Sequence, residues 1–330
     1  MSGARSGGLD AVRVAALVAV VAGHVWLSSR VLHDAVFAWH VPVFFFLTGL
    51  LERPGRTTGE EARKRIRSIG LPYVVWLAVL LAAYATVQGP GSWPSLGGIA
   101  SGLEAAHRPF HTFWFLSSLL VTAVLARLLS PLALRWQLVV ALGGAIAGTL
   151  AGPALARTPL AVGTAVFCLP FVIAGVAAQR VLPRIRRRAA VGAALVAAGA
   201  IALLLGAQPV DLKAGDVGTP VLGYALGVAV PAGLVLLAEA LFDRLPEAAG
   251  RVATALALPA VVVLLLHPVV LWLLRTPSSG RVLDFALCLL VPWAVGLLVV
   301  RSPLAPVLAG TARVRRPRRG GVGRSSLSSP

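Results

Sequence analysis

The sequence contains ten apolar segments that reach, or nearly reach, the length of about 20 residues that a helix needs to cross a bilayer. Turn-forming and charged residues separate them, as in "ERPGRTTGEEARKR" after the second segment. Because a backbone in lipid must satisfy its own hydrogen bonds, this pattern predicts an all-α, polytopic membrane bundle of about ten transmembrane helices. The second and fifth segments are short and are candidates for a tilted or broken helix. The segments cover residues 11–29, 36–52, 69–88, 111–130, 136–152, 158–178, 189–207, 220–242, 254–275 and 282–300.

The charge pattern favours a membrane protein over a nucleic-acid-binding protein. The chain has 30 Lys and Arg against 12 Asp and Glu, a net charge of +18, yet only 13% of its residues are charged. Its basic residues lie between apolar runs rather than on one surface, so the positive-inside rule explains them and no nucleic-acid partner is expected. With a cytoplasmic N-terminus, roughly 23 basic residues fall inside and roughly 6 outside. We therefore expect both termini in the cytoplasm.

The expected domain organisation is simple. Residues 1–10 form a cytoplasmic N-terminus, residues 11–300 a single membrane domain, and residues 301–330 a basic, disordered cytoplasmic tail near anionic lipid. A cleaved signal peptide is not expected, because Asp10 and Arg13 interrupt the first apolar segment. Cys168 and Cys288 each lie alone in an apolar run, so we interpret both as buried structural thiols and expect no metal.

Arg13 and His24 lie in the first apolar segment, eleven residues apart. In a helix this spacing is three turns and about 20°, so both side chains share one face, ~16 Å apart along the axis. Asp10 can pair with Arg13 on that face. An ionisable residue inside a span is a candidate for function. Two other interpretations stay open: Arg13 could extend to the lipid headgroups, and His24 could be bonded to a neighbouring helix.

The six histidines and most arginines fall on opposite sides of the predicted membrane. His24, His33, His40, His107, His111 and His267 all fall in the outer half, whereas most arginines lie at the inner face. A polyanionic cofactor could bind guanidinium groups from the cytoplasm. Its reactive end would then reach an imidazole that acts as general base, and burial favours the neutral imidazole that can accept a proton. A phosphopantetheine arm is comparable in length to the ~16 Å between Arg13 and His24.

Five stretches in order resemble the acyltransferase-3 family of bacterial membrane O-acyltransferases, in particular its sugar O-acetylase branch. They are the R-x10-H pair Arg13 and His24, "WHVPVFFFLTGLL" (39–51), "RKRIRSIGLPYVVW" (63–76), "FWFLSSLLV" (113–121) and "LPFVIAGVAAQ" (169–179). The resemblance covers about residues 8–300. It implies a multi-pass enzyme of the bacterial plasma membrane that transfers an acyl group, commonly acetyl from acetyl-CoA, to a hydroxyl of a carbohydrate, envelope glycan or glycolipid.

The same resemblance implies roles for particular residues. His24 would be catalytic, and Arg13 would help to hold acetyl-CoA or another acyl-CoA. Family members also carry an R-x-x-R pair before the third helix, where this chain has Lys64-x-x-Arg67 with Arg65 between them. We expect these three bases to contact the CoA phosphates, although a cluster that only sets the topology is the alternative.

Three further residues are candidates for the acceptor site. His40 would lie near the acceptor or fix the turn at its helix entrance, and Trp114 would stack on a sugar ring or belong to an interfacial aromatic belt. His267, in "LLLHPVV", lies in the outer half of the ninth segment.

Two other functional classes remain open. A transporter or flippase of a glycolipid or anionic metabolite would also need many helices and buried ionisable groups, although no inverted repeat is evident in the sequence. The second open class is a catalytically inactive relative that acts as a sensor or a scaffold.

Overall fold

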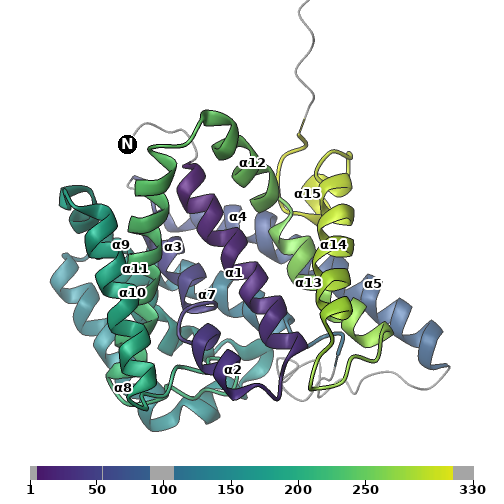
Figure 1. The fold of residues 1–330 in the computed structure, drawn as a ribbon, viewed down its shortest axis with the longest axis horizontal. Coiled ribbons are helices and arrows are strands. Elements are labelled where there is room, and N and C mark those ends of the chain that lie inside the picture. The colour runs from purple at the N-terminus through teal and green to yellow at the C-terminus, as the bar shows by residue number, and fades with distance from the viewer. Residues whose placement is uncertain (1–5, 54, 90–107, 315–330) are drawn as a thin grey trace, which may run out of the picture.

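The computed structural model describes residues 6–53, 55–89 and 108–314 of the chain. Within these residues the chain folds into helices joined by turns, so the predicted all-α class is confirmed (Figure 1). His107 lies outside the described residues. The α-helices are α1 (Gly7–Val25), α2 (Arg30–Phe37), α3 (Pro42–Leu50), α4 (Thr58–Arg65), α5 (Leu71–Gln88), α7 (Phe113–Leu129), α8 (Leu134–Ala156), α9 (Thr164–Val181), α10 (Arg188–Leu204), α11 (Leu222–Phe242), α12 (Glu247–Ala257), α13 (Ala260–Leu273), α14 (Val282–Val299) and α15 (Ala305–Leu308).

The helices have the length and composition of a multi-pass membrane protein. Within the described residues, seven helical stretches are long and apolar enough to cross a bilayer, or eight if the bent pair α12 and α13 forms one span. The apolar helices α7 and α10 are slightly shorter, with 17 residues each. Each of the ten predicted segments therefore falls on helical structure, while seven or eight meet the length of a full span.

Prolines explain where two of the predicted segments break. The second segment divides into α2 and α3, with a turn at Ala38–Val41 directly before Pro42. The ninth segment was expected to be continuous over 254–275, but it consists of α12 and α13, bent by 55° at Leu258–Pro259. A proline lacks the N–H of the helical ladder, and its ring clashes with the carbonyl group four residues earlier in a continuous helix, so both breaks follow from local chemistry.

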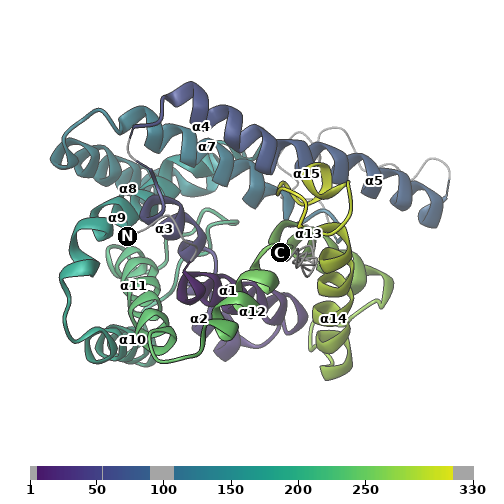
Figure 2. The same cartoon turned by 90° about the horizontal axis from the view of Figure 1, so that it is seen from above.

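Helix α1 lies inside the bundle and positions the groups of the R-x10-H pair. It contacts α2, α3, α11, α12, α13 and α14, and Figure 2 shows these helices gathered around it. The Ser6 side chain caps its first turn by accepting a hydrogen bond from the N–H of Leu9. Buried residues follow along its whole length, from Leu9 to Val25. In contrast, α5 lies at the edge, and its far end projects from the bundle (Figure 2).

The chain packs as an ordered segment beyond residue 300. Helix α15 lies against α5, where the indole N–H of Trp76 donates to the carbonyl oxygen of Leu308 at 2.8 Å. Ala305 and Ala309 are buried in this contact. The structure therefore differs from the expected disordered tail over residues 301–314, and residues 315–330 lie outside its described part.

Small residues allow α3 and α9 to approach closely. A methyl group at Gly49 would collide with the backbone of Val172 on α9, and one at Gly175 would collide with the carbonyl oxygen of Phe46 on α3. Helix pairs in membranes depend on such contacts, because lipid provides little hydrophobic driving force between helices.

The substitution Gly175→Val tests this contact. It should force α3 and α9 apart and lower the free energy of unfolding by about 1–3 kcal/mol, the usual cost of overpacking. Gly143 is the matched control, because a Cβ added there meets no atom of another part of the chain within 4 Å. Heating the purified variants in detergent and measuring the folded fraction should show loss of stability for Gly175→Val and not for Gly143→Val. Equal stability of the two variants would contradict the close packing.

Candidate active site

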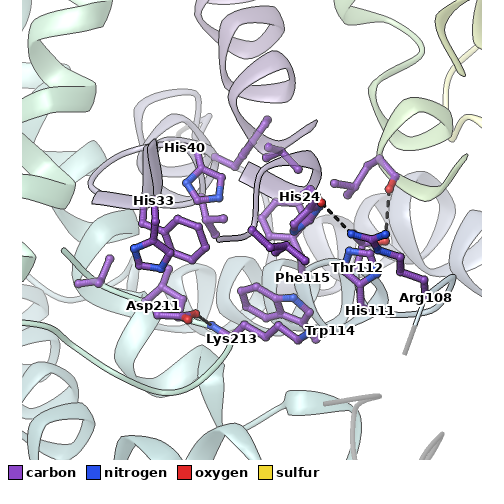
Figure 3. Close-up of a pocket in the computed structure, with 18 of the residues that line it drawn as sticks. His24, His33, His40, Arg108, His111, Thr112, Trp114, Phe115, Asp211 and Lys213 are labelled. Carbon is purple, nitrogen blue, oxygen red and sulfur yellow. Dashed lines mark hydrogen bonds between the residues drawn. The ribbon is translucent and has the colours of Figure 1, made fainter. Parts of the chain in front are cut away.

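A cavity of about 730 Å³ lies at the end of the bundle where α1 finishes. His33 and His40 lie on one side of His24, and Arg108 and His111 lie on the other (Figure 3). The α10–α11 loop contributes further residues, and the backbone N–H of Lys213 donates to Asp211 Oδ1 at 3.1 Å. The lining comprises Val20, His24, Leu27, His33, Phe37, His40, Val41, Phe44, Tyr84, Arg108, His111, Thr112, Trp114, Phe115, Val210, Asp211, Leu212, Lys213, Leu264 and Trp272.

His24 lies in the last turn of α1 and is bonded to a histidine of another helix. Its Nδ1 is 2.8 Å from Nε2 of His267 on α13, and the two rings are nearly parallel, with 8° between their planes. Nδ1 of His267 lies 3.0 Å from the carbonyl oxygen of Val263, one turn earlier in α13. His24 lines the cavity, whereas His267 is fully buried behind it. The side chain of His24 therefore faces protein and cavity rather than lipid.

The sequence His267-Pro268 also attaches the next segment of the site. Because Pro268 has no N–H, the carbonyl of Leu264 loses its helical partner, and the hydroxyl of Thr112 donates to it at 3.2 Å. This bond holds the turn before α7 against α13. The neighbouring His111 ring consequently lies edge-on to His24, with 4.5 Å between ring centroids.

Arg108 holds the end of α1 in place. Its guanidinium donates to the carbonyl oxygen of His24 at 3.0 Å and to that of Thr276 at 2.8 Å. Burial lowers the pKa of Arg108, but a guanidinium remains charged at any physiological pH. A fixed positive charge therefore lies beside the histidines.

Three imidazoles are close enough together to raise the question of a metal site. The ligand atoms of His24, His111 and His267 all lie within 4.8 Å of one another. Two nitrogens on a tetrahedral zinc ion, with bonds of about 2.0–2.1 Å, lie ~3.3 Å apart. The 2.8 Å between His24 and His267 instead has the length of a hydrogen bond, which would have to break before both could hold one ion. The two nitrogens are therefore spaced as hydrogen-bond partners rather than as ligands of one ion.

Of the three residues expected in the acceptor site, His40 and Trp114 line the cavity and His267 does not. His40 lies in the turn between α2 and α3, where its Nδ1 is 2.7 Å from the carbonyl oxygen of Val36, so this side chain also fixes the turn. Trp114 lies in the first turn of α7. Tyr84 and Trp272, which stack on each other with centroids 5.4 Å apart, add aromatic surface. Flat apolar rings beside imidazoles suit a carbohydrate, whose ring faces are apolar and whose edges are hydroxyls.

Arg13 lies toward the opposite end of α1. Its guanidinium bonds to Asp10 at 2.5 Å, and the buried Asp10 also accepts a hydrogen bond from Thr254 of α12 at 2.8 Å. The pairing of Asp10 with Arg13 that the sequence predicts is therefore present. Arg13 is not among the residues that line the cavity around His24.

Lys64, Arg65 and Arg67 lie between the second and third predicted segments, on α4 and the short π-helix η1 (Ile66–Gly70). Glu61 lies among their basic groups: Arg65 binds it at 2.7 Å and Lys64 lies 3.7 Å away. Arg65 is therefore largely committed to this carboxylate, and Arg67 is exposed. The basic residues of the segment carry more positive charge than the single buried carboxylate, Glu61, can neutralise.

Sequence reasoning missed the contribution of Arg108 and of the α10–α11 loop to the cavity. Their side chains reach the site from loops, where no helical periodicity exists to reveal a shared face. His111 was recognised as an outer histidine, but its contact with His24 depends on the Thr112–Leu264 bond.

A family model described as an acyltransferase domain, that of the acyltransferase-3 family, matches residues 6–305. No curated protein and no solved structure gave a significant match. The match spans almost all of the described chain and includes every histidine, arginine and tryptophan discussed above. The chain therefore belongs to the acyltransferase-3 family and is a membrane acyltransferase.

Proposed function

We propose that this protein is an O-acyltransferase that moves an acyl group, first of all acetyl, from cytoplasmic acyl-CoA to a hydroxyl of a carbohydrate, envelope glycan or glycolipid. His24 acts as general base. The observation that carries the proposal is the position of this imidazole, which lines a cavity together with aromatic rings and is bonded from behind by another histidine. A base held in this way can take a proton from an acceptor bound in the cavity.

The charges at the two ends of the bundle support the direction of transfer. The N-terminus of α1, α4 and α15 lie at the end opposite the cavity (Figure 1). By the positive-inside rule, the basic segment around α4 makes that end cytoplasmic. CoA phosphates would bind there to Arg13, Lys64 and Arg67, with Arg65 adding to the positive field, and the acceptor would bind at the external end.

The donor must reach His24 through packed helices. Arg13 is not part of the cavity lining. Val20 lines the cavity, whereas Leu17 and Val21, which also lie between Arg13 and His24 on α1, are buried outside the lining. The proposal therefore requires α1 and its neighbours to part when a pantetheine arm binds, so that the thioester and the acceptor hydroxyl meet at His24.

A transporter or flippase remains the second candidate, because a 730 Å³ cavity at one end of a bundle could also hold a cargo molecule. The membership of the acyltransferase-3 family favours the enzyme. Thioester consumption separates the two: a transporter moves its cargo without releasing free CoA.

The first test is the substitution His24→Ala. Purified protein in nanodiscs, given acetyl-CoA and an envelope glycan, should release CoA and acetylate the glycan, and the variant should lose this activity by ~10²–10⁴-fold, the usual share of a general base. Free CoA and acetylated product are measured in parallel. Release of CoA at the wild-type rate by His24→Ala would overturn the proposal.

The second test concerns the donor. Arg13→Gln removes the charge but keeps an N–H for Asp10, so the buried carboxylate is not left without a hydrogen bond. Loss of a charge-assisted contact of about 1.5–3 kcal/mol should weaken acetyl-CoA binding by roughly 10- to 150-fold, with the KM of the acceptor unchanged. Isothermal titration measures the affinity. Arg251→Gln is the control, because Arg251 is an exposed base on α12 that is paired only with Glu247 among the described residues. Equal donor affinity in the Arg13 and Arg251 variants would contradict this role.

A further inference from the structure

We infer that His267 orients the base: it fixes the tautomer of His24, so that Nε2 of His24 is the atom that accepts the proton. The inference rests on the proposed role of His24 and goes beyond it, because it assigns a positioning function to a second histidine that does not contact the acceptor. His267 was expected among the acceptor-binding residues, but it is fully buried and is absent from the cavity lining.

The direction of each hydrogen bond follows from the chemistry of its partners. The carbonyl oxygen of Val263 can only accept, so Nδ1 of His267, 3.0 Å away, must carry a hydrogen. A neutral imidazole has one N–H, so Nε2 of His267 is then an acceptor. A hydrogen on both nitrogens would make His267 a cation with no exposed surface, beside the charge of Arg108, and burying an unpaired charge is costly.

His24 must therefore donate through Nδ1. This atom lies 2.8 Å from Nε2 of His267, a hydrogen-bond distance, and the planes of the two rings are nearly parallel. In neutral His24 the hydrogen on Nδ1 leaves the lone pair on Nε2. The chain of bonds, from His24 through His267 to the backbone of α13, thus selects one of two tautomers for the residue that lines the cavity.

The same bond stabilises His24 after it has accepted a proton. The acceptor hydroxyl gives its proton to Nε2 of His24 while its oxygen attacks the thioester carbon. His24 is then an imidazolium, and its Nδ1–H bond to His267 becomes charge-assisted and stronger. When the C–S bond breaks, Nε2 returns the proton to the sulfur, and free CoA and an O-acyl ester are the products. His267 keeps its own hydrogen throughout.

Local sequence holds His267 in this position. Its imidazole bonds back to its own helix, and the adjacent Pro268 frees the carbonyl that receives Thr112. Helix α13 is thus fixed at the level of His267 both internally and to the turn before α7. Because the His267 ring is already fixed, it loses little conformational freedom when it pairs with His24. A partner that is fixed in this way can hold the base in one orientation.

The decisive comparison is between His267→Leu and His267→Gln. Leucine removes the nitrogen that accepts the hydrogen bond from His24 and keeps much of the side-chain volume. It should lower kcat by ~10²-fold or more, within the ~10⁴-fold that a general base supplies, with the KM of donor and acceptor changed by no more than about twofold. Glutamine places a carbonyl oxygen near the position of Nε2, so it should lose only about 10-fold or less. Cys288→Ala is the packing control, because its thiol contacts the backbone carbonyl of His267 rather than the ring; its kcat should be unchanged.

Nitrogen NMR of protein labelled with 15N-histidine reads the tautomer directly, with the His24 signals assigned from the spectrum of His24→Gln. The wild type should show hydrogen on Nδ1 of His24, and His267→Leu should show a mixture of tautomers. A wild-type spectrum with hydrogen on Nε2 would overturn the inference, even if His267→Leu fails to fold. So would a His267→Leu enzyme that keeps its kcat, or one that changes only the KM of the acceptor. Each of these results is distinct from an active His24→Ala enzyme, which would refute the proposed function itself.

Discussion

The hydrogen bond between His24 and His267 is the contact on which the site depends. Lipid offers no partner to a polar side chain, so an imidazole inside a span must be satisfied by another helix or by a water-filled cavity. His24 has both, with His267 on one side and the cavity on the other. The bond joins α1 to α13, residues 243 positions apart, and the Thr112 and Arg108 contacts attach the turn before α7 to the same pair.

Much of the fold could be predicted because lipid imposes simple requirements on a sequence. Runs of apolar residues marked all ten helical segments, and the spacing of Arg13 and His24 placed both side chains on one face of the first. The pairing of Asp10 with Arg13 also followed from helical geometry. These features are local, and a periodicity of 3.6 residues is enough to reveal them.

The partner of His24 could not be identified from the sequence, because no spacing rule connects residues on α1 and α13. Sequence reasoning had left open that His24 bonds to a neighbouring helix, and had treated this as an alternative to function. In the structure the bond and the accessible position of His24 occur together. The bend between α12 and α13 was missed for another reason. Pro259 lies inside a continuous apolar run, and hydropathy does not register a change in helix direction.

The buried stretch of α1 between Arg13 and His24 has a consequence for the cell as well as for the reaction. Leu17 and Val21 are buried in this stretch and lie outside the cavity lining. A channel wide enough for a pantetheine arm would also pass water, and with it protons and small ions, and would discharge the membrane potential. A path that opens only when the donor binds would keep the bilayer impermeable to ions between turnovers.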